Sequence, residues 1–291
     1  MLRSFVSVLL ALTAVFSAIR SLTSRPTAPV GGEVIKYGSA YNQCLDIFMP
    51  DKVGDTADVV LTIHGGTWSY GDQHQFDKYA QMAAEYGYIG VSLDHRKLTD
   101  NVRIDGMLGD IQSAVTAVKQ YMEKKGIAAG KMIVAGHSSG AHLALLYSYK
   151  HYEDSPIPIA FVTAVSAPCD MELFIKGSTT LRNNYYLLTA LADEEISEIT
   201  IGTAQGSAAL AKINPIDFVT PDVPPTILVH GDMDEVVPYN CSVKLYNVLR
   251  ENGVDAKLIT FKDQAHQVSL APQKMRQGAV DAMLEWADKY L

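Results

Sequence analysis

The stretch that decides the fold is MIVAGHSSGAHLALLY, residues 132–147. It begins as an apolar run typical of a buried strand, passes through the pentapeptide GHSSG centred on Ser138, and continues at once as an apolar helical pattern. A turn this sharp brings the two backbones together, so Gly136 and Gly140 stand where a Cβ atom would have no space. The turn therefore holds the Ser138 hydroxyl in the open at the end of a strand.

Strand-like and helix-like segments alternate outward from this turn along residues 31–291. Several strand segments are continuous apolar runs, as the buried strands of parallel sheets are. Apolar residues recur at helical spacing over 105–125 and 274–291. The pattern predicts an α/β fold, a mostly parallel sheet of about eight strands with helices on both faces. We expect the strands at 33–38, 44–50, 58–64, 88–94, 132–136, 160–167, 226–231 and 257–262.

One connection is longer than the rest. Residues 171–225 separate the sixth expected strand from the seventh, well beyond the usual loop length. They contain a helix-like segment at 180–195 and a Ser/Ala-rich stretch before NPIDFVTPDVPP. Insertions at the catalytic edge of such a sheet commonly cover the substrate site. We therefore expect a helical cap insertion at 171–225, with an additional packing layer as the alternative.

The first 30 residues differ in character from the rest. Arg3 precedes an apolar run over residues 5–19, and further arginines follow it. The length of the run falls between a signal-peptide h-region and the roughly 20 residues of a spanning helix. Residues 1–30 are expected to be a signal peptide or N-terminal membrane anchor with a short linker, which would place the domain outside the cytoplasm. A buried amphipathic helix is the alternative.

Composition argues against several partners. The formal net charge is −8, and no Lys/Arg cluster interleaved with aromatic residues could follow a phosphate backbone, so nucleic acid is not expected. Cys44, Cys169 and Cys241 lie far apart and match neither a zinc-ligand spacing nor a disulfide framework. We expect them to pack in the core, with a pocket-lining role for Cys169 as the alternative. No metal site is indicated.

A glycine turn follows the third expected strand, in IHGGTW at 63–68. Backbone N–H groups in such a turn can point at an oxygen that becomes negative, with no side chain in the way. The N–H groups of Gly66 and Thr67, with that of Ser139 after the GHSSG turn, are therefore candidate oxyanion-hole donors. His64 is expected to brace the turn by hydrogen bonding. The alternative is that the two glycines make only a tight turn.

Ser138, held in the open at a sharp turn from strand to helix, is a candidate nucleophile. A serine nucleophile needs a base, and the base needs an acid to orient it. The segment TILVHGDMDEVVP at 226–238 places three acidic residues directly after an expected strand. Its resemblance to the pattern H-G-x-x-D-x-x-V-P of many hydrolases aligns the acid with Asp234, and Asp232 is the competing candidate. The base is expected after the last strand, where His266 is the only histidine. The chain order is thus Ser138, Asp234, His266.

Taken together, IHGGTW, the D-H-R at 94–96, AGHSSGAHLA, HGDMDEVVP and the lone C-terminal histidine resemble the esterase/lipase branch of the α/β hydrolases. That branch contains relatives of hormone-sensitive lipase, acetylesterases and kynurenine formamidase. The resemblance runs from Tyr37 to the C-terminus. Thr67 replaces a third glycine of many lipases, and His95-Arg96 replaces the usual Tyr-Arg. Thr67 favours the formamidase-like or feruloyl/acetyl-esterase-like members.

The resemblance implies the α/β-hydrolase fold and two-step hydrolysis of small-molecule carboxylic esters with small or medium acyl groups, without a cofactor. Ser138 would attack, His266 would move the proton, and Asp234 would stabilise the imidazolium. Trp68 and His137 are expected to contact the substrate. An amidase, formamidase or peptidase on the same fold is the first alternative. A non-catalytic binding module at the cell surface is the second.

Overall fold

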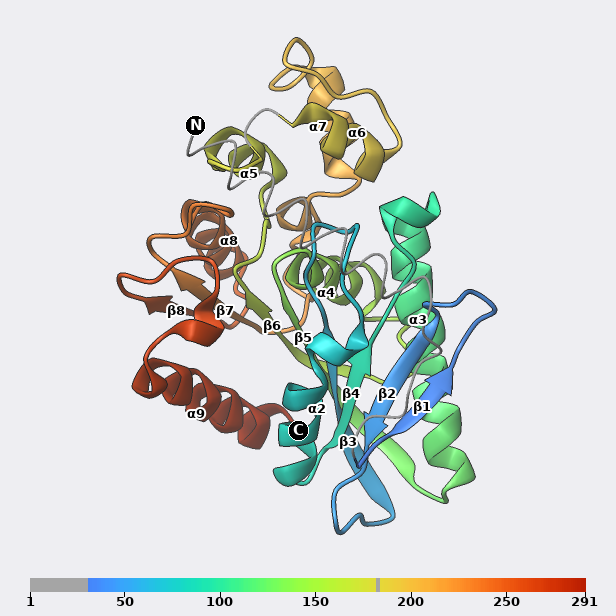
Figure 1. Ribbon diagram of the computed structural model, residues 1–291. Helices are drawn as coiled ribbons and strands as arrows, with labels where there is room; N and C mark the ends of the chain where they lie inside the picture. Colours follow the sequence, from blue (N-terminus) through green and yellow to red (C-terminus); the bar gives the residue numbers. More distant parts are fainter. Residues whose placement is uncertain (1–30, 182–183) are drawn as a thin grey trace, which may run out of the picture.

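The computed structural model describes residues 31–181 and 184–291 of the 291-residue chain. These residues form an eight-stranded sheet with helices on both faces (Figure 1). The expected signal peptide or anchor at 1–30 lies outside the described residues and stays a prediction. Among the described helices, none has the length and apolar character needed to cross a membrane.

The strand order within the described sheet is β1-β2-β4-β3-β5-β6-β7-β8. β2 pairs antiparallel with β1 and β4, and all the other neighbours are parallel. Each strand lies within a few residues of its expected limits, so the fold class is confirmed. The strands are β1 (Glu33–Lys36), β2 (Cys44–Phe48), β3 (Thr56–Ile63), β4 (Ile89–Leu93), β5 (Ala128–His137), β6 (Ile159–Val165), β7 (Thr226–Gly231) and β8 (Ala256–Phe261).

Helices pack on each face through side chains that alternate along the strands. Val134 and Leu228 belong to the core that also takes in α3, α4 and α8. Phe161 and Ile227 point the other way and pack with Trp286 of α9. The α-helices are α2 (Asp77–Glu85), α3 (Ile104–Lys124), α4 (Ser139–His151), α5 (Met171–Gly177), α6 (Tyr185–Ala192), α7 (Ala204–Ala211), α8 (Asn240–Glu251) and α9 (Gln273–Tyr290).

Strand β4 lies unusually close to helix α2. Its residues Ile89 and Val91 face the core that contains α3 and α4. Gly90 points to the opposite face, where a Cβ atom would lie 1.8 Å from the carbonyl oxygen of Ala80 in α2. The backbones of the helix and the strand are therefore in direct contact, which only glycine allows. A short 3₁₀ helix, η1 (Gln73–Gln75), leads into α2.

The segment between β6 and β7 contains α5, α6, α7 and a 3₁₀ helix, η3 (Pro215–Phe218). α6 begins where the Asn184 side chain accepts a hydrogen bond from the Leu187 N–H, and it ends at Asp193 in a left-handed conformation. α6 and α7 stand apart from the sheet at the top of Figure 1. Leu188 and Leu210 are buried between them and the main core. The role of this segment as a cap stays a prediction.

Candidate active site

Ser138 occupies the turn between β5 and α4 in a strained conformation, with φ 56° and ψ −124°. The glycines around it make this turn possible. A Cβ at Gly136 would lie 2.4 Å from the carbonyl oxygen of Gly140, and one at Gly140 would lie 2.3 Å from that of His64. The second contact shows that position 140 requires glycine for a further reason, which the sequence did not reveal: Gly140 also packs against the end of β3. The Ser138 N–H donates to Val165 O at 2.8 Å, which ties the turn to β6.

The structure brings Ser138, His266 and Asp234 together in one hydrogen-bonded chain. His266 Nε2 lies 3.0 Å from Ser138 Oγ, and His266 Nδ1 lies 2.7 Å from Asp234 Oδ2. Asp234 follows β7 and His266 follows β8, so the parallel strand ends deliver all three side chains to one edge. The competing acid, Asp232, is exposed and accepts a hydrogen bond from the Asp263 N–H instead. Asp234, and not Asp232, contacts the histidine.

The carboxylate of Asp234 is buried and well supplied with donors. Its Oδ1 accepts the N–H groups of Val236 and Val237, each at 2.8 Å. Burial opposes ionisation, but hydrogen bonds from His230 and His266 outweigh it and hold the pKa of Asp234 below its usual range. An ionised Asp234 keeps the hydrogen of His266 on Nδ1, which leaves Nε2 able to accept a proton.

The main chain of His266 is held by two further side chains. Its carbonyl oxygen accepts hydrogen bonds from His137 Nε2 at 3.1 Å and from Ser166 Oγ at 3.3 Å. Burial, followed by the neighbouring His266 ring, lowers the pKa of His137 to about 4. His137 is therefore neutral at pH 7, and its ring contacts the His266 loop. Its expected contact with substrate stays a prediction.

The glycine turn after β3 lies directly against the serine. A Cβ at Gly65 would lie 3.2 Å from the Cβ of Ser138. Gly66 and Thr67 have positive φ angles of 126° and 52°. In the part of the chain that the structure describes, the N–H groups of these two residues have no protein acceptor. The third expected donor, the N–H of Ser139, belongs to the first turn of α4, where helical N–H groups lack intrahelical partners.

His64 connects this turn to a buried ion pair. Its Nδ1 lies 2.7 Å from Gly65 O and its Nε2 lies 3.2 Å from Asp94 Oδ1. Asp94 also accepts hydrogen bonds from Lys97 Nζ at 2.6 Å and from the His95 N–H at 2.7 Å. Sequence reasoning did not identify Asp94 and Lys97 as support for the turn. The D-H-R that contains Asp94 was the available signal, but nothing in its spacing indicated a contact with β3.

Trp68 is only 2% exposed. Its Nε1 donates to His142 Nδ1 at 3.2 Å, and His142 Nε2 donates to Ile213 O at 2.7 Å. The indole also makes an edge contact with Phe174 of α5, with ring centroids 6.2 Å apart. Trp68 therefore links the glycine turn to the 171–225 segment, and its expected contact with substrate stays a prediction. Cys169 is buried and free, as are the other two cysteines, all of which lie in the described residues.

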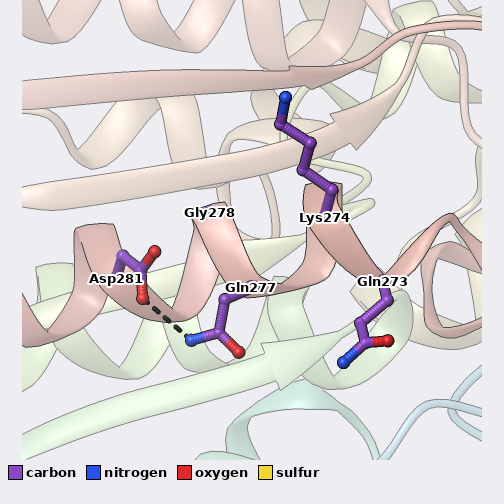
Figure 2. A pocket seen from close by; sticks show the side chains of 5 residues that line it. All are labelled: Gln273, Lys274, Gln277, Gly278 and Asp281. Carbon is purple, nitrogen blue, oxygen red and sulfur yellow. Dashed lines mark hydrogen bonds between the residues drawn. The ribbon is translucent and has the colours of Figure 1, made fainter.

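A hollow on α9 is separate from these residues. Figure 2 shows its lining residues along α9, with Gln277 Nε2 donating to Asp281 Oδ1 at 2.8 Å. None of the predicted site residues lines it, so it has no part in the chemistry of Ser138. The lining residues are Gln273, Lys274, Gln277, Gly278 and Asp281.

The arrangement around Ser138 has the parts that acyl transfer needs. A hydroxyl, an imidazole and a carboxylate are joined in sequence, and a glycine turn with N–H groups lies beside the hydroxyl. The imidazole can take a proton from the hydroxyl while the carboxylate balances the new positive charge. The N–H groups of the turn are available to a developing negative oxygen.

Comparisons with known proteins found related enzymes. A probable isoprenylcysteine alpha-carbonyl methylesterase of Arabidopsis thaliana is 24% identical over 264 residues, which are 86% of this chain and 54% of that protein. The chain thus spans about half the length of this relative. Kynurenine formamidase of Danio rerio is 25% identical over 208 residues, covering 66% of this chain and 69% of that protein.

Solved structures share the fold. Esterase B of Lactobacillus rhamnosis superposes with a TM-score of 0.76 at 20% identity, covering 98% of this chain and 94% of that one. Residues 45–249 match the model of the BD-FAE family. Because this match takes in well over half of the residues, the chain belongs to the BD-FAE family, within the esterase/lipase branch of the α/β hydrolases.

Proposed function

We propose that the protein is a serine esterase that hydrolyses carboxylic esters with small or medium acyl groups through an acyl-enzyme. The observation that carries the proposal is the hydrogen-bonded chain from Ser138 through His266 to Asp234, with Nε2–Oγ at 3.0 Å and Nδ1–Oδ2 at 2.7 Å. The Nε2–Oγ link is short enough for direct proton transfer, and the Nδ1–Oδ2 link orients the imidazole. Family membership and the esterases among the relatives support the same reaction class.

In the first half of the reaction, Ser138 Oγ attacks the ester carbonyl carbon while His266 Nε2 takes the hydroxyl proton. The carbonyl oxygen becomes negative and receives hydrogen bonds from the N–H groups of Gly66, Thr67 and Ser139. When the intermediate collapses, His266 returns the proton to the departing alkoxide. The products of this half are a free alcohol and an acyl group bound to the serine oxygen.

In the second half, water replaces the alcohol. His266 removes a proton from the water as its oxygen attacks the acyl carbon, and then protonates Ser138 Oγ as the acid departs. Asp234 stabilises the imidazolium in both halves, and its low pKa keeps it ionised across the working range.

A formamidase or amidase is the second candidate. It uses the same three side chains, because attack on an amide differs only in the leaving group. The similarity to Danio rerio kynurenine formamidase favours it, while Thr67, which stands where many lipases have glycine, is shared by the formamidase-like and the feruloyl/acetyl-esterase-like members. A panel of p-nitrophenyl acetate, longer-chain esters, feruloyl esters, N-formylkynurenine and peptide anilides distinguishes the candidates. The highest kcat/KM on a short-chain ester supports the esterase, and the highest on N-formylkynurenine supports the formamidase.

The serine nucleophile is tested by replacing adjacent serines. Ser138→Ala is expected to lower kcat on p-nitrophenyl acetate by about 10⁴-fold or more while the protein stays folded, because it removes the attacking atom. Ser139→Ala is the matched control, since it keeps the backbone N–H and loses only a side chain that the mechanism does not use. A fluorophosphonate probe should label the wild type and Ser139→Ala but not Ser138→Ala. Esterase activity that survives in Ser138→Ala contradicts the proposal. Failure of the probe to label the wild type also contradicts it and supports a non-catalytic binding module.

We also propose that residues 1–30 direct the domain out of the cytoplasm. The support is the apolar run over residues 5–19, preceded by Arg3 and followed by further arginines. Mass spectrometry of the N-terminus of the protein from its native host distinguishes the two forms, because a signal peptide is removed and an anchor is retained. An intact N-terminus on protein recovered from the soluble cytoplasmic fraction contradicts both.

A further inference from the structure

A cluster of Asp46, His74 and Asp77 lies outside the candidate active site. Asp46 belongs to β2, His74 to η1 and Asp77 to the first turn of α2. One nitrogen or oxygen atom from each residue lies within 4.8 Å of the other two. Asp46 is thus brought together with residues 28 and 31 positions later in the sequence, where α2 covers the sheet.

The buried carboxylate of Asp46 is left without a hydrogen-bond partner. Its side chain is 0% exposed, and within the described residues neither of its oxygens has a donor. His74 Nδ1 lies 3.0 Å from Asp46 Oδ2 and 2.8 Å from Asp77 Oδ2. A ring nitrogen carries at most one hydrogen, and here it forms its hydrogen bond with Asp77. A buried carboxylate without a hydrogen-bond donor is costly, and Asp46 and Asp77 share the partly exposed His74 between them, so this geometry favours a further cation.

We propose that Asp46, His74 and Asp77 bind one divalent transition-metal cation of the Zn²⁺ or Mn²⁺ type. Two carboxylate oxygens and one imidazole nitrogen are donors that suit these ions. In a tetrahedral site with bonds of ~2.0–2.1 Å, the donor atoms lie ~3.3 Å apart. The distances of 2.8 and 3.0 Å from His74 Nδ1 are only slightly shorter. A small opening of the cluster therefore makes room for the ion.

The three side chains differ in exposure, and the exposed ones give the ion a route to the site. Asp46 is the closed floor, while the side chains of His74 and Asp77 are 39% and 20% exposed at the rim. Water can reach the cluster from the rim and complete the coordination.

The position of the cluster suggests what the ion would do. It would join β2 to η1 and α2 immediately after the turn that begins at Gly66. That turn is packed tightly at its far end, because a Cβ at Gly71 would lie 2.4 Å from His64 Nδ1. A bound cation fixes the next residues of the chain and stabilises the folded state by mass action.

The test measures metal binding directly and does not depend on the proposed esterase activity. Untagged protein is dialysed against EDTA and then titrated with ZnCl₂ or MnCl₂ by calorimetry, with metal content and Tm measured in parallel. The wild type is expected to bind one ion per chain and to show a higher Tm with the ion. Asp46→Asn and His74→Gln should each weaken the binding at least about 100-fold. His74→Gln changes only the exposed rim, so it serves if Asp46→Asn does not fold.

Asp154→Asn is the matched control. His151 and Asp154 have the same sequence spacing as His74 and Asp77 and lie 3.1 Å apart, but in the described residues no buried carboxylate joins them. This variant should bind the ion as the wild type does. The proposal is overturned if the wild type takes up neither ion, or if Asp46→Asn and His74→Gln bind as tightly as the wild type. Loss of binding in His74→Gln alone, with full binding in Asp46→Asn, also overturns it, because it indicates a surface histidine.

Discussion

At Asp234 the two carboxylate oxygens have separate tasks. Oδ1 is held by the N–H groups of Val236 and Val237, so the side chain cannot rotate away. Oδ2 receives His266 Nδ1 at 2.7 Å and also lies 3.2 Å from His230 Nε2. Because Oδ1 is fixed, the position of Oδ2 is fixed as well. The main chain after β7 therefore orients the His266 imidazole, together with the loop after β8 that carries His266.

Replacing each of the two candidate acids tests this assignment. Asp234→Asn is expected to lower kcat by about 10⁴-fold, because an amide can place its NH₂ group toward His266 and favour the wrong tautomer. Asp232→Asn should stay within a few-fold of the wild type, since within the described residues the Asp232 carboxylate accepts its hydrogen bond from the Asp263 N–H and not from His266. Steady-state kinetics of both variants on one ester decide the question. A larger loss in Asp232→Asn than in Asp234→Asn would contradict the geometry.

His137 is a positioning residue in this scheme, because it acts through the carbonyl of His266. His137→Phe keeps a ring but removes the donor, so the His266 loop loses one of its two side-chain hydrogen bonds. We expect kcat to fall about 10-fold with KM unchanged, as misplacing a catalytic group slows chemistry more than binding. His137→Gln, which restores an N–H donor, should recover most of the rate. Equal losses in both variants, or a change confined to KM, would argue for a substrate contact instead.

At the scale of elements, the contact between β4 and α2 depends on one missing methyl group. Gly90→Ala would place a Cβ 1.8 Å from the carbonyl oxygen of Ala80, which is backbone and cannot rotate away. The helix and the strand would have to separate, at a cost of about 3 kcal/mol or more in the free energy of unfolding. Gly109→Ala in α3 is the control. Nothing lies within 4 Å of its Cβ position, so alanine should stabilise the helix by about 0.5–1 kcal/mol. Urea denaturation of both variants measures the difference, and equal effects would rule out the clash.

The sequence predicted those elements whose signal is local. Continuous apolar runs marked the strands, and Gly136 and Gly140 marked the turn at Ser138, because each pattern reports its own neighbourhood. The strand order was not predictable in this way, since it depends on which strands pair across the sheet. Trp68 shows the same limit within the site. Its position beside the glycine turn suggested a pocket, but its burial depends on His142 and Phe174, which are distant in sequence.

The cluster of Asp46, His74 and Asp77 escaped the sequence analysis for a related reason. Metal-ligand motifs are recognised when the ligands recur at fixed spacing on one element. Here one ligand comes from β2, and the other two follow the crossover into α2. Asp46 appeared only as a polar residue within an apolar strand, and its lack of a partner became visible only with α2 in place. Ser138 and His266 were predictable because each is marked locally, Ser138 by the GHSSG turn and His266 as the only histidine after the last strand.

Across the whole molecule, neutral histidines join elements that are distant in sequence. His142 connects Trp68 in the glycine turn to the carbonyl of Ile213 before β7. It accepts with Nδ1 and donates with Nε2, so the contact requires the neutral ring. His137 connects β5 to the loop after β8. Burial is the main cause that lowers the pKa of each to about 4, because a charged ring would lose its hydration.

These histidines make the stability of the fold sensitive to acid. An unfolded chain binds protons at these rings near the ordinary pKa of 6.5, whereas the folded chain resists protonation until about pH 4. Between these values the unfolded state holds more protons, so stability falls as the pH is lowered. The contribution of each ring is full above pH 6.5 and has disappeared by about pH 4. His142 alone should account for about 3 kcal/mol of this loss.

His142→Gln removes the titrating group while keeping one acceptor and one donor in its place. It should be less stable than the wild type at pH 7, because the geometry of an amide fits Trp68 and Ile213 less well than that of an imidazole. Its free energy of unfolding should then decline less than that of the wild type between pH 7 and pH 4.5, so the two curves converge in acid. Urea denaturation at intervals across this range gives both curves. Parallel curves would contradict this prediction, because they would mean that His142 takes up a proton as readily in the folded chain as in the unfolded one. A protonated ring has no acceptor nitrogen, so the hydrogen bond from Trp68 to His142 could not form.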